Sequence, residues 1–186
     1  MDICFVHGLT GTLLPPKLRK ARILTYGYDA YVVHKSVAST NGLIFVAHSL
    51  GGLVCKDAIL LSRNNPEPHL RGIFDCIEGI VFMGTPHRGS WMADWAKIPA
   101  SALGILKSTN KSLLKILETD DNYLQSAQDR FWSLIREQQR AGRDLEITCF
   151  FEELPLPVVG KVVSKDSATL EGYNAISIYA NHGSMV

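Results

Sequence analysis

The sequence predicts an α/β fold with a doubly wound, mainly parallel sheet and helices on both faces. Short apolar runs alternate with helix-like segments along the 186 residues, which is typical of strand–helix–strand units. The runs are continuously apolar rather than alternating, as expected of strands that are covered on both faces. The chain is long enough for one buried core and short for two, so we expect a single domain over residues 1–186.

Five apolar runs are the candidate strands, and each ends in small, polar or acidic residues. They are Asp2–Val6, Arg22–Tyr26, Leu43–Ala47, Gly79–Met83 and Leu145–Phe151. Their carboxyl ends should share one edge of the sheet, which is where open α/β folds bind their ligands. The connections at 8–21 and 27–42 are short for parallel crossovers that contain a full helix.

Helical spacing is clearest from Asp120 to about Ala141. Apolar residues recur there every three or four positions, acidic residues stand in the first turn, and Gly142 marks the end. We expect this helix to pack on the core. A helix-compatible segment also follows the third strand at Leu53–Leu61, and the prolines of Leu154–Pro157 predict a loop.

The segment between Ser90 and Asp120 is one that a minimal α/β fold does not need. Its apolar residues suit a lid over an acyl pocket, or else simple packing on the core: Trp91, Trp95, Ile98, Leu103, Ile105 and Leu106. Together with the helix that follows, this segment defines a cap-like insertion at about 91–141.

Composition excludes several function classes. The net charge is only +1 with scattered Lys and Arg, so there is no electrostatic case for nucleic acid. No apolar run approaches the ~20 residues of a transmembrane segment, and the N-terminus lacks the pattern of a secretion signal. The cysteines lie far apart, without metal-ligand spacing, which favours free thiols and an intracellular, cytoplasmic protein: Cys4, Cys55, Cys76 and Cys149.

Residues Ala47–Gly51 have the pattern of a nucleophile elbow, in which a strand turns sharply into a helix and exposes a Ser hydroxyl. Ala47 replaces the first Gly of the G-x-S-x-G pattern, and it is the next smallest residue. The alternative is an ordinary strand-to-helix turn with a Ser cap. Ser49 is the candidate nucleophile.

A base and an acid follow Ser49 in the chain order Ser, acid, His. His182 is the last His and stands in a loop-like context. The other histidines have simpler explanations, with His48 at the freely variable elbow position and His87 in a turn. Glu152 is the candidate acid because it comes first after its apolar run, with Glu153 and Asp166 as competitors.

Two further segments bear on the site. Backbone N–H groups of the loop at His7–Gly11, together with that of Leu50, are candidates for binding an oxyanion. The block Gly84–Gly89 follows the fourth strand; its Arg88 either contacts a polar head group or belongs to a structural turn closed by a buried hydrogen bond.

Motifs in a fixed order resemble the α/β-hydrolase superfamily, and within it the serine esterase and lipase-like domains common in fungi. They are His7-Gly8-Leu9, Tyr26-Gly27-Tyr28-Asp29, Ala47-His48-Ser49-Leu50-Gly51-Gly52, Met83-Gly84-Thr85-Pro86-His87-Arg88-Gly89-Ser90 and Ala180-Asn181-His182. Such domains often begin larger multidomain proteins, including NLR-like signalling proteins.

The resemblance implies a Ser-acid-His triad and ester hydrolysis without a metal or other cofactor. It assigns Ser49 as nucleophile, His182 as base and a carboxylate near Glu152 as the acid, with the amides of Leu9 and Leu50 as the oxyanion hole. The expected partner is a small-molecule or lipid ester, and further domains of a longer protein are expected. The alternative is a degenerate hydrolase domain that serves signalling or ligand binding.

Overall fold

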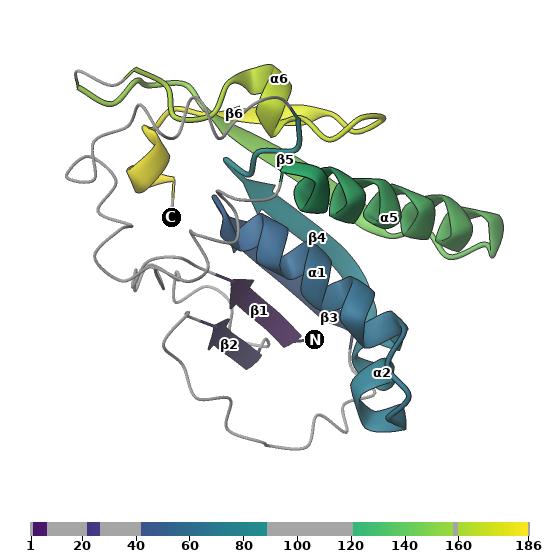
Figure 1. Cartoon of the computed structure of the whole chain (residues 1–186). Coiled ribbons are helices and arrows are strands. Elements are labelled where there is room, and N and C mark those ends of the chain that lie inside the picture. Colours follow the sequence, from purple (N-terminus) through teal and green to yellow (C-terminus); the bar gives the residue numbers. More distant parts are fainter. Residues whose placement is uncertain (1, 7–21, 27–41, 89–120, 158–159, 186) are drawn as a thin grey trace.

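A computed structural model describes residues 2–6, 22–26, 42–88, 121–157 and 160–185. Within these ranges the chain forms one sheet of six strands in the order β2-β1-β3-β4-β5-β6, and every neighbouring pair is parallel (Figure 1). The strands are β1 (Asp2–Val6), β2 (Arg22–Tyr26), β3 (Leu43–His48), β4 (Ile77–Met83), β5 (Glu146–Glu152) and β6 (Ala175–Ile178). The prediction of an α/β fold with a parallel sheet is therefore confirmed.

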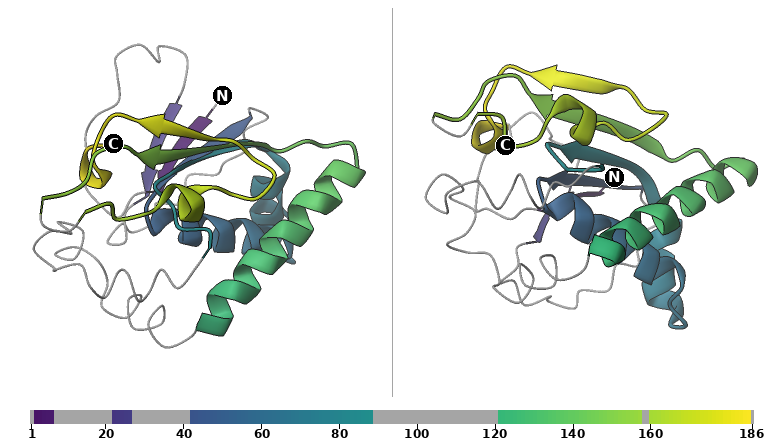
Figure 2. Two further views of the ribbon diagram at one scale, coloured as in Figure 1. Left: turned by 90° about the horizontal axis from the view of Figure 1, so that it is seen from above. Right: turned by 45° about the horizontal axis from the view of Figure 1, so that its top comes forward.

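Three helices of eight residues or more accompany the sheet in the described part of the chain. They are α1 (Gly51–Arg63), α2 (Pro68–Asp75) and α5 (Asp121–Arg140). A short α6 (Lys165–Ala168) and a 3-10 turn, η2 (His182–Ser184), follow near the C-terminus. α1 and α5 lie on the same face of the sheet (Figure 2).

The main core lies between the sheet and these two helices. Alternate residues of the central strands, such as Phe45 and Phe82, pack against α1 and α5. α5 contributes Phe131, Leu134 and Ile135, all at most 1% exposed, so it is the packing helix that its periodicity predicts. Residues of β3 that point to the other face, Ile44 and Val46, are only half-buried.

The sequence predictions of the fold differ from the structure in detail. All five predicted strands are present, and the structure adds β6 and α2, which were not predicted. The loop at Leu154–Pro157 is present, apart from one antiparallel bridge of Leu156 with Gly160. Several predictions lie outside the described residues. They are the short connections at 8–21 and 27–42, apart from residue 42, the 91–120 part of the cap-like insertion, and helices on the face of the sheet opposite α1 and α5.

Candidate active site

The turn after β3 has the backbone conformation of a nucleophile elbow. Ser49 has φ of 58°, in the left-handed region that residues with a side chain rarely adopt. Its N–H donates to the carbonyl of Met83 on β4 at 2.9 Å, which holds the turn against the neighbouring strand. Ala47 is fully buried, and α1 begins at Gly51.

Gly52 explains why the start of α1 needs small residues. A Cβ at this position would lie 2.2 Å from Thr85 Oγ1 and 2.3 Å from its Cγ2. Thr85 is itself completely buried, so neither side can give way easily. The close approach lets α1 begin directly behind the elbow and beside the segment that follows β4.

His182 lies beside the Ser49 hydroxyl, although 133 residues separate them in sequence. Its Nε2 is 3.0 Å from Ser49 Oγ, and its Nδ1 is 2.7 Å from Glu152 Oε2. All three residues are at most 3% exposed. These contacts have the geometry expected of a Ser-His-acid triad, in which a carboxylate that accepts from Nδ1–H leaves Nε2 free of a proton and able to accept from the serine.

The structure also distinguishes between the three candidate carboxylates. Glu152, at the end of β5, is 1% exposed, whereas Glu153 and Asp166 are exposed. The second oxygen of Glu152, Oε1, accepts from the N–H groups of Val162 and of Val163, the latter at 3.2 Å. These amide donors fix the carboxylate and leave Oε2 directed to His182.

Main-chain hydrogen bonds hold the loop that carries His182: Leu154 N–H, just after β5, donates to Ala180 O at 3.1 Å, and Ala180 N–H donates to Ile178 O of β6 at 2.7 Å. Asn181 caps η2 through its Oδ1, which accepts from Ser184 N–H at 3.1 Å. Gly84, with φ of 55°, lies against the imidazole; a Cβ there would be 2.9 Å from His182 Cε1. Any larger residue at 84 would therefore displace the ring.

His48 occupies the variable position of the elbow pattern, which predicts no role for it in the site. In the structure it is 2% exposed, and its Nε2 lies 2.9 Å from the main-chain oxygen of His182. The elbow pattern carries no signal for this contact, because it depends on a residue 134 positions away.

The oxyanion-hole candidates are only partly described. Leu50, 3% exposed, is the N-cap of α1, so its N–H lies at the positive end of that helix. Leu9, with the rest of the His7–Gly11 loop, lies outside the described residues. Among the described residues, no group of three or more His, Cys, Asp and Glu side chains is arranged to hold a metal ion.

A buried polar cluster lies between α1, which follows the elbow, and α5. Lys56 of α1 donates to His87 Nδ1 at 2.7 Å and to Gln128 Oε1 of α5 at 2.5 Å. His87 Nε2 in turn lies 3.8 Å from Cys149 Sγ. Burial lowers the pKa of Lys56 to about 7, and burial and the Lys56 charge lower the pKa of His87.

These contacts favour the structural interpretation of the Gly84–Gly89 block. The His87 side chain is buried beside Lys56, and the main-chain N–H of His87 donates to the carbonyl of Ser167 at 2.7 Å. Arg88 forms an ion pair with Glu171 at 2.7 Å. The described part of the block thus connects α1, β5 and the segment around α6.

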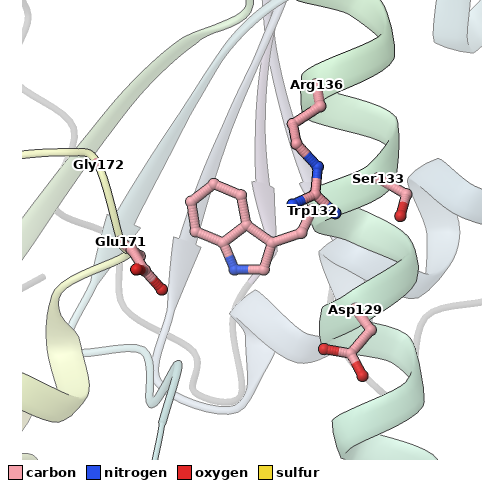
Figure 3. A pocket seen from close by; sticks show the side chains of 6 residues that line it. All are labelled: Asp129, Trp132, Ser133, Arg136, Glu171 and Gly172. Carbon is pink, nitrogen blue, oxygen red and sulfur yellow. The ribbon is translucent and has the colours of Figure 1, made fainter.

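A separate pocket of about 520 Å³ lies between α5 and the segment at Glu171–Gly172. Figure 3 shows the Trp132 indole between these two segments, with Arg136 on the same helix. The pocket does not include Ser49, His182 or Glu152. It is lined by Asp129, Trp132, Ser133, Arg136, Glu171 and Gly172. In the described part of the chain, no helix is both long and apolar enough to cross a membrane.

Curated relatives match about three quarters of this chain. Protein SERAC1 from cattle is 29% identical over 145 residues, which are 75% of this chain and 20% of the relative. Human and mouse Protein SERAC1 are 27% and 28% identical over the same shares. The chain thus spans about a fifth of the length of these curated relatives. A further relative is from Danio rerio, and these vertebrate proteins do not support the expected fungal and NLR-like association.

No solved structure matches the chain significantly. A family model described as "Putative serine esterase (DUF676)" matches residues 18–125, which is more than half of the chain and includes Ser49 but neither Glu152 nor His182. The chain therefore belongs to the putative serine esterase family DUF676.

Proposed function

We propose that this domain is a serine hydrolase that cleaves carboxylic esters through an acyl-enzyme on Ser49. The observation that carries the proposal is the continuous set of contacts from Glu152 through His182 to Ser49, at 2.7 Å and 3.0 Å. Membership of a serine esterase family supports the same chemistry. His182 is the proposed general base and Glu152 the acid that orients it.

The proposed reaction has two halves. Ser49 Oγ attacks the ester carbonyl carbon while its proton passes to His182 Nε2, giving a tetrahedral oxyanion. Collapse of the oxyanion breaks the bond to the alkoxy oxygen, which takes the proton from His182 and leaves as the alcohol. Water then attacks the acyl-enzyme by the same route, and the carboxylic acid leaves with Ser49 restored.

The N–H of Leu50 is the described candidate for stabilising the oxyanion, because Leu50 follows the nucleophile and is the N-cap of α1. The resemblance to the hydrolase superfamily implies Leu9 as the second donor. One such donor is typically worth about 10²–10³ in kcat. Both assignments belong to the proposal.

A fluorophosphonate probe tests the proposed nucleophile directly. The parent protein should become covalently labelled at Ser49, since the probe reacts with an activated serine. Ser49→Ala should remain unlabelled, while Ser126→Ala, which removes an exposed hydroxyl of α5, should label like the parent. A folded parent that does not react would favour the alternative of a degenerate domain for signalling or ligand binding.

The substrate class is the less constrained part of the proposal. The apolar residues at 91–106 favour a lipid ester, and a series of p-nitrophenyl esters from acetate to palmitate should then show a preference for longer acyl chains. Equal rates along the series would count against an acyl pocket. Attachment to further domains and a cytoplasmic location stay predictions.

A further inference from the structure

Two consecutive residues of the elbow contact His182 at two different points. Ser49 Oγ lies 3.0 Å from the imidazole Nε2, and His48 Nε2 lies 2.9 Å from the main-chain oxygen of His182. The two rings also lie close, with centroids 4.9 Å apart and planes tilted by 39°. His48 therefore connects the strand that carries the nucleophile to the loop that carries the base.

The direction of this hydrogen bond follows from its acceptor. A carbonyl oxygen can only accept, so Nε2 of His48 must carry a proton and donate it. Both residues are buried, at 2% and 1% exposure, and a buried carbonyl that loses a hydrogen-bond donor destabilises the folded protein. The folded state therefore favours keeping this hydrogen bond.

We propose that His48 is a positioning residue for the reaction: its Nε2–H holds the main chain of His182 so that the imidazole stays aligned with Ser49. The inference rests on the proposed function. Glu152 fixes the Nδ1 side of the ring, and main-chain hydrogen bonds hold the neighbouring residues of the loop. The bond from His48 holds the carbonyl of His182 itself, and it does so from the residue covalently joined to the nucleophile.

This arrangement couples the positions of nucleophile and base. A displacement of β3 relative to η2 would change the Ser49–His182 and the His48–His182 contacts together, because Ser49 and His48 are adjacent residues. A displacement of about 1 Å between reacting groups can cost roughly 10²-fold in rate. Loss of the His48 bond should therefore slow acylation more than it weakens substrate binding.

The test compares two substitutions at position 48 in the intact chain. Leu occupies much of the space of the ring but cannot donate, whereas Gln can place its amide N–H₂ near the position of Nε2. We expect His48→Leu to lower the rate of fluorophosphonate labelling and kcat for a p-nitrophenyl ester by about 10- to 100-fold with little change in KM. His48→Gln should stay within a few-fold of the parent. His69→Leu, which changes an exposed histidine of α2, is the matched control.

Each outcome decides the inference. Parent-like labelling of folded H48L would overturn it, and so would equal losses in H48L and H48Q, because ring packing rather than hydrogen bonding would then explain the effect. Proton–nitrogen NMR of histidines, which needs no turnover, separates this from a failure of the proposed function. The positioning role would stand, even for an inert parent, on two results: His48 is protonated at Nε2, and the His182 Nδ1–H signal broadens less in H48Q than in H48L. A parent in which His48 is protonated only at Nδ1 would overturn the inference. This second result does not depend on whether H48L folds.

Discussion

Glu152 is held at both carboxylate oxygens, and this makes its chemistry sensitive to a single-atom change. Oε1 accepts from two main-chain N–H groups and Oε2 from His182. In Glu152→Gln the amide oxygen must stay with the main-chain donors, so the N–H₂ group faces His182. It then donates to Nδ1, and the imidazole has to carry its proton on Nε2.

An imidazole in that tautomer cannot accept the Ser49 proton. We therefore expect Glu152→Gln to lower kcat by roughly 10⁴-fold, as in other triads whose acid becomes an amide, with little effect on folding. Glu153→Gln, at the exposed neighbouring residue, should keep the parent kcat. Steady-state hydrolysis of a p-nitrophenyl ester measures both, and equal effects would remove Glu152 from the proposed triad.

Gly84 gives a second prediction at the scale of one residue. A Cβ there would lie 2.9 Å from His182 Cε1 and 3.0 Å from Nδ1, and the ring cannot retreat without breaking its bond to Glu152. The φ of 55° adds backbone strain for any residue but glycine. Gly84→Ala should lower the rate of Ser49 labelling by about 10²-fold.

The control for this prediction is the glycine next to His182 itself. At Gly183 a Cβ would meet only Asn181 Oδ1, at 3.8 Å, an ordinary contact. Gly183→Ala should therefore label at nearly the parent rate, as followed by gel fluorescence with time. Equal labelling of the two variants would mean that Gly84 does not position the imidazole.

At the scale of an element, the start of α1 depends on the contact between Gly52 and Thr85. A methyl group at 52 would overlap a fully buried side chain, and overpacking of this kind typically costs about 1–3 kcal/mol. Gly52→Ala should lower the free energy of unfolding by that amount, measured by urea denaturation, and should also slow labelling, because α1 carries the elbow.

α2 offers the matched substitution. Gly72 lies inside that helix, and a Cβ there meets nothing within 4 Å. Alanine is favoured over glycine in a helix by about 0.5–1 kcal/mol, so Gly72→Ala should raise stability slightly. If both variants gain stability, the close contact with Thr85 is not what requires Gly52.

For the whole molecule, the sequence predicted the parts that depend on local pattern. Continuous apolar runs gave β1 to β5, and helical spacing gave α5 almost to the residue. β6 was missed because it has only four residues and its Ile176 is half exposed. α2 was missed although Pro68 stands in its first turn, a recognised helix-start signal.

The contacts of the candidate site were predictable to the same extent. Motif and chain order name Ser49 and His182, which lie together in the structure. The sequence could not separate Glu152 from Glu153, because adjacent strand residues point to opposite faces and the end of β5 was uncertain by one residue. Neither the His48 contact nor the burial of Lys56 has a local signal. A lysine in a helix usually lies at the surface, and only packing between α1 and α5 shows otherwise.

Lys56 has a consequence for the stability of the whole molecule. Its pKa is lowered from 10.5 to about 7 by burial, so between these values the unfolded chain binds a proton that the folded protein does not. The free energy of unfolding therefore rises with pH through this range. Above pH 9 the thiols of Cys4 and Cys55 oppose it, because burial raises their pKa values, that of Cys4 to about 11.

The clear window is thus pH 7 to 9. Each pH unit within it contributes at most about 1.4 kcal/mol, so the parent should gain up to about 2–3 kcal/mol relative to Lys56→Met, measured by urea denaturation at several pH values. Lys161→Met removes an exposed lysine and should give a curve parallel to that of the parent. If the curve of Lys56→Met is also parallel to that of the parent, Lys56 stays protonated in the folded protein. The interpretation that Lys56 is a neutral amine above pH 7, and donates to His87 in that form, would then be wrong.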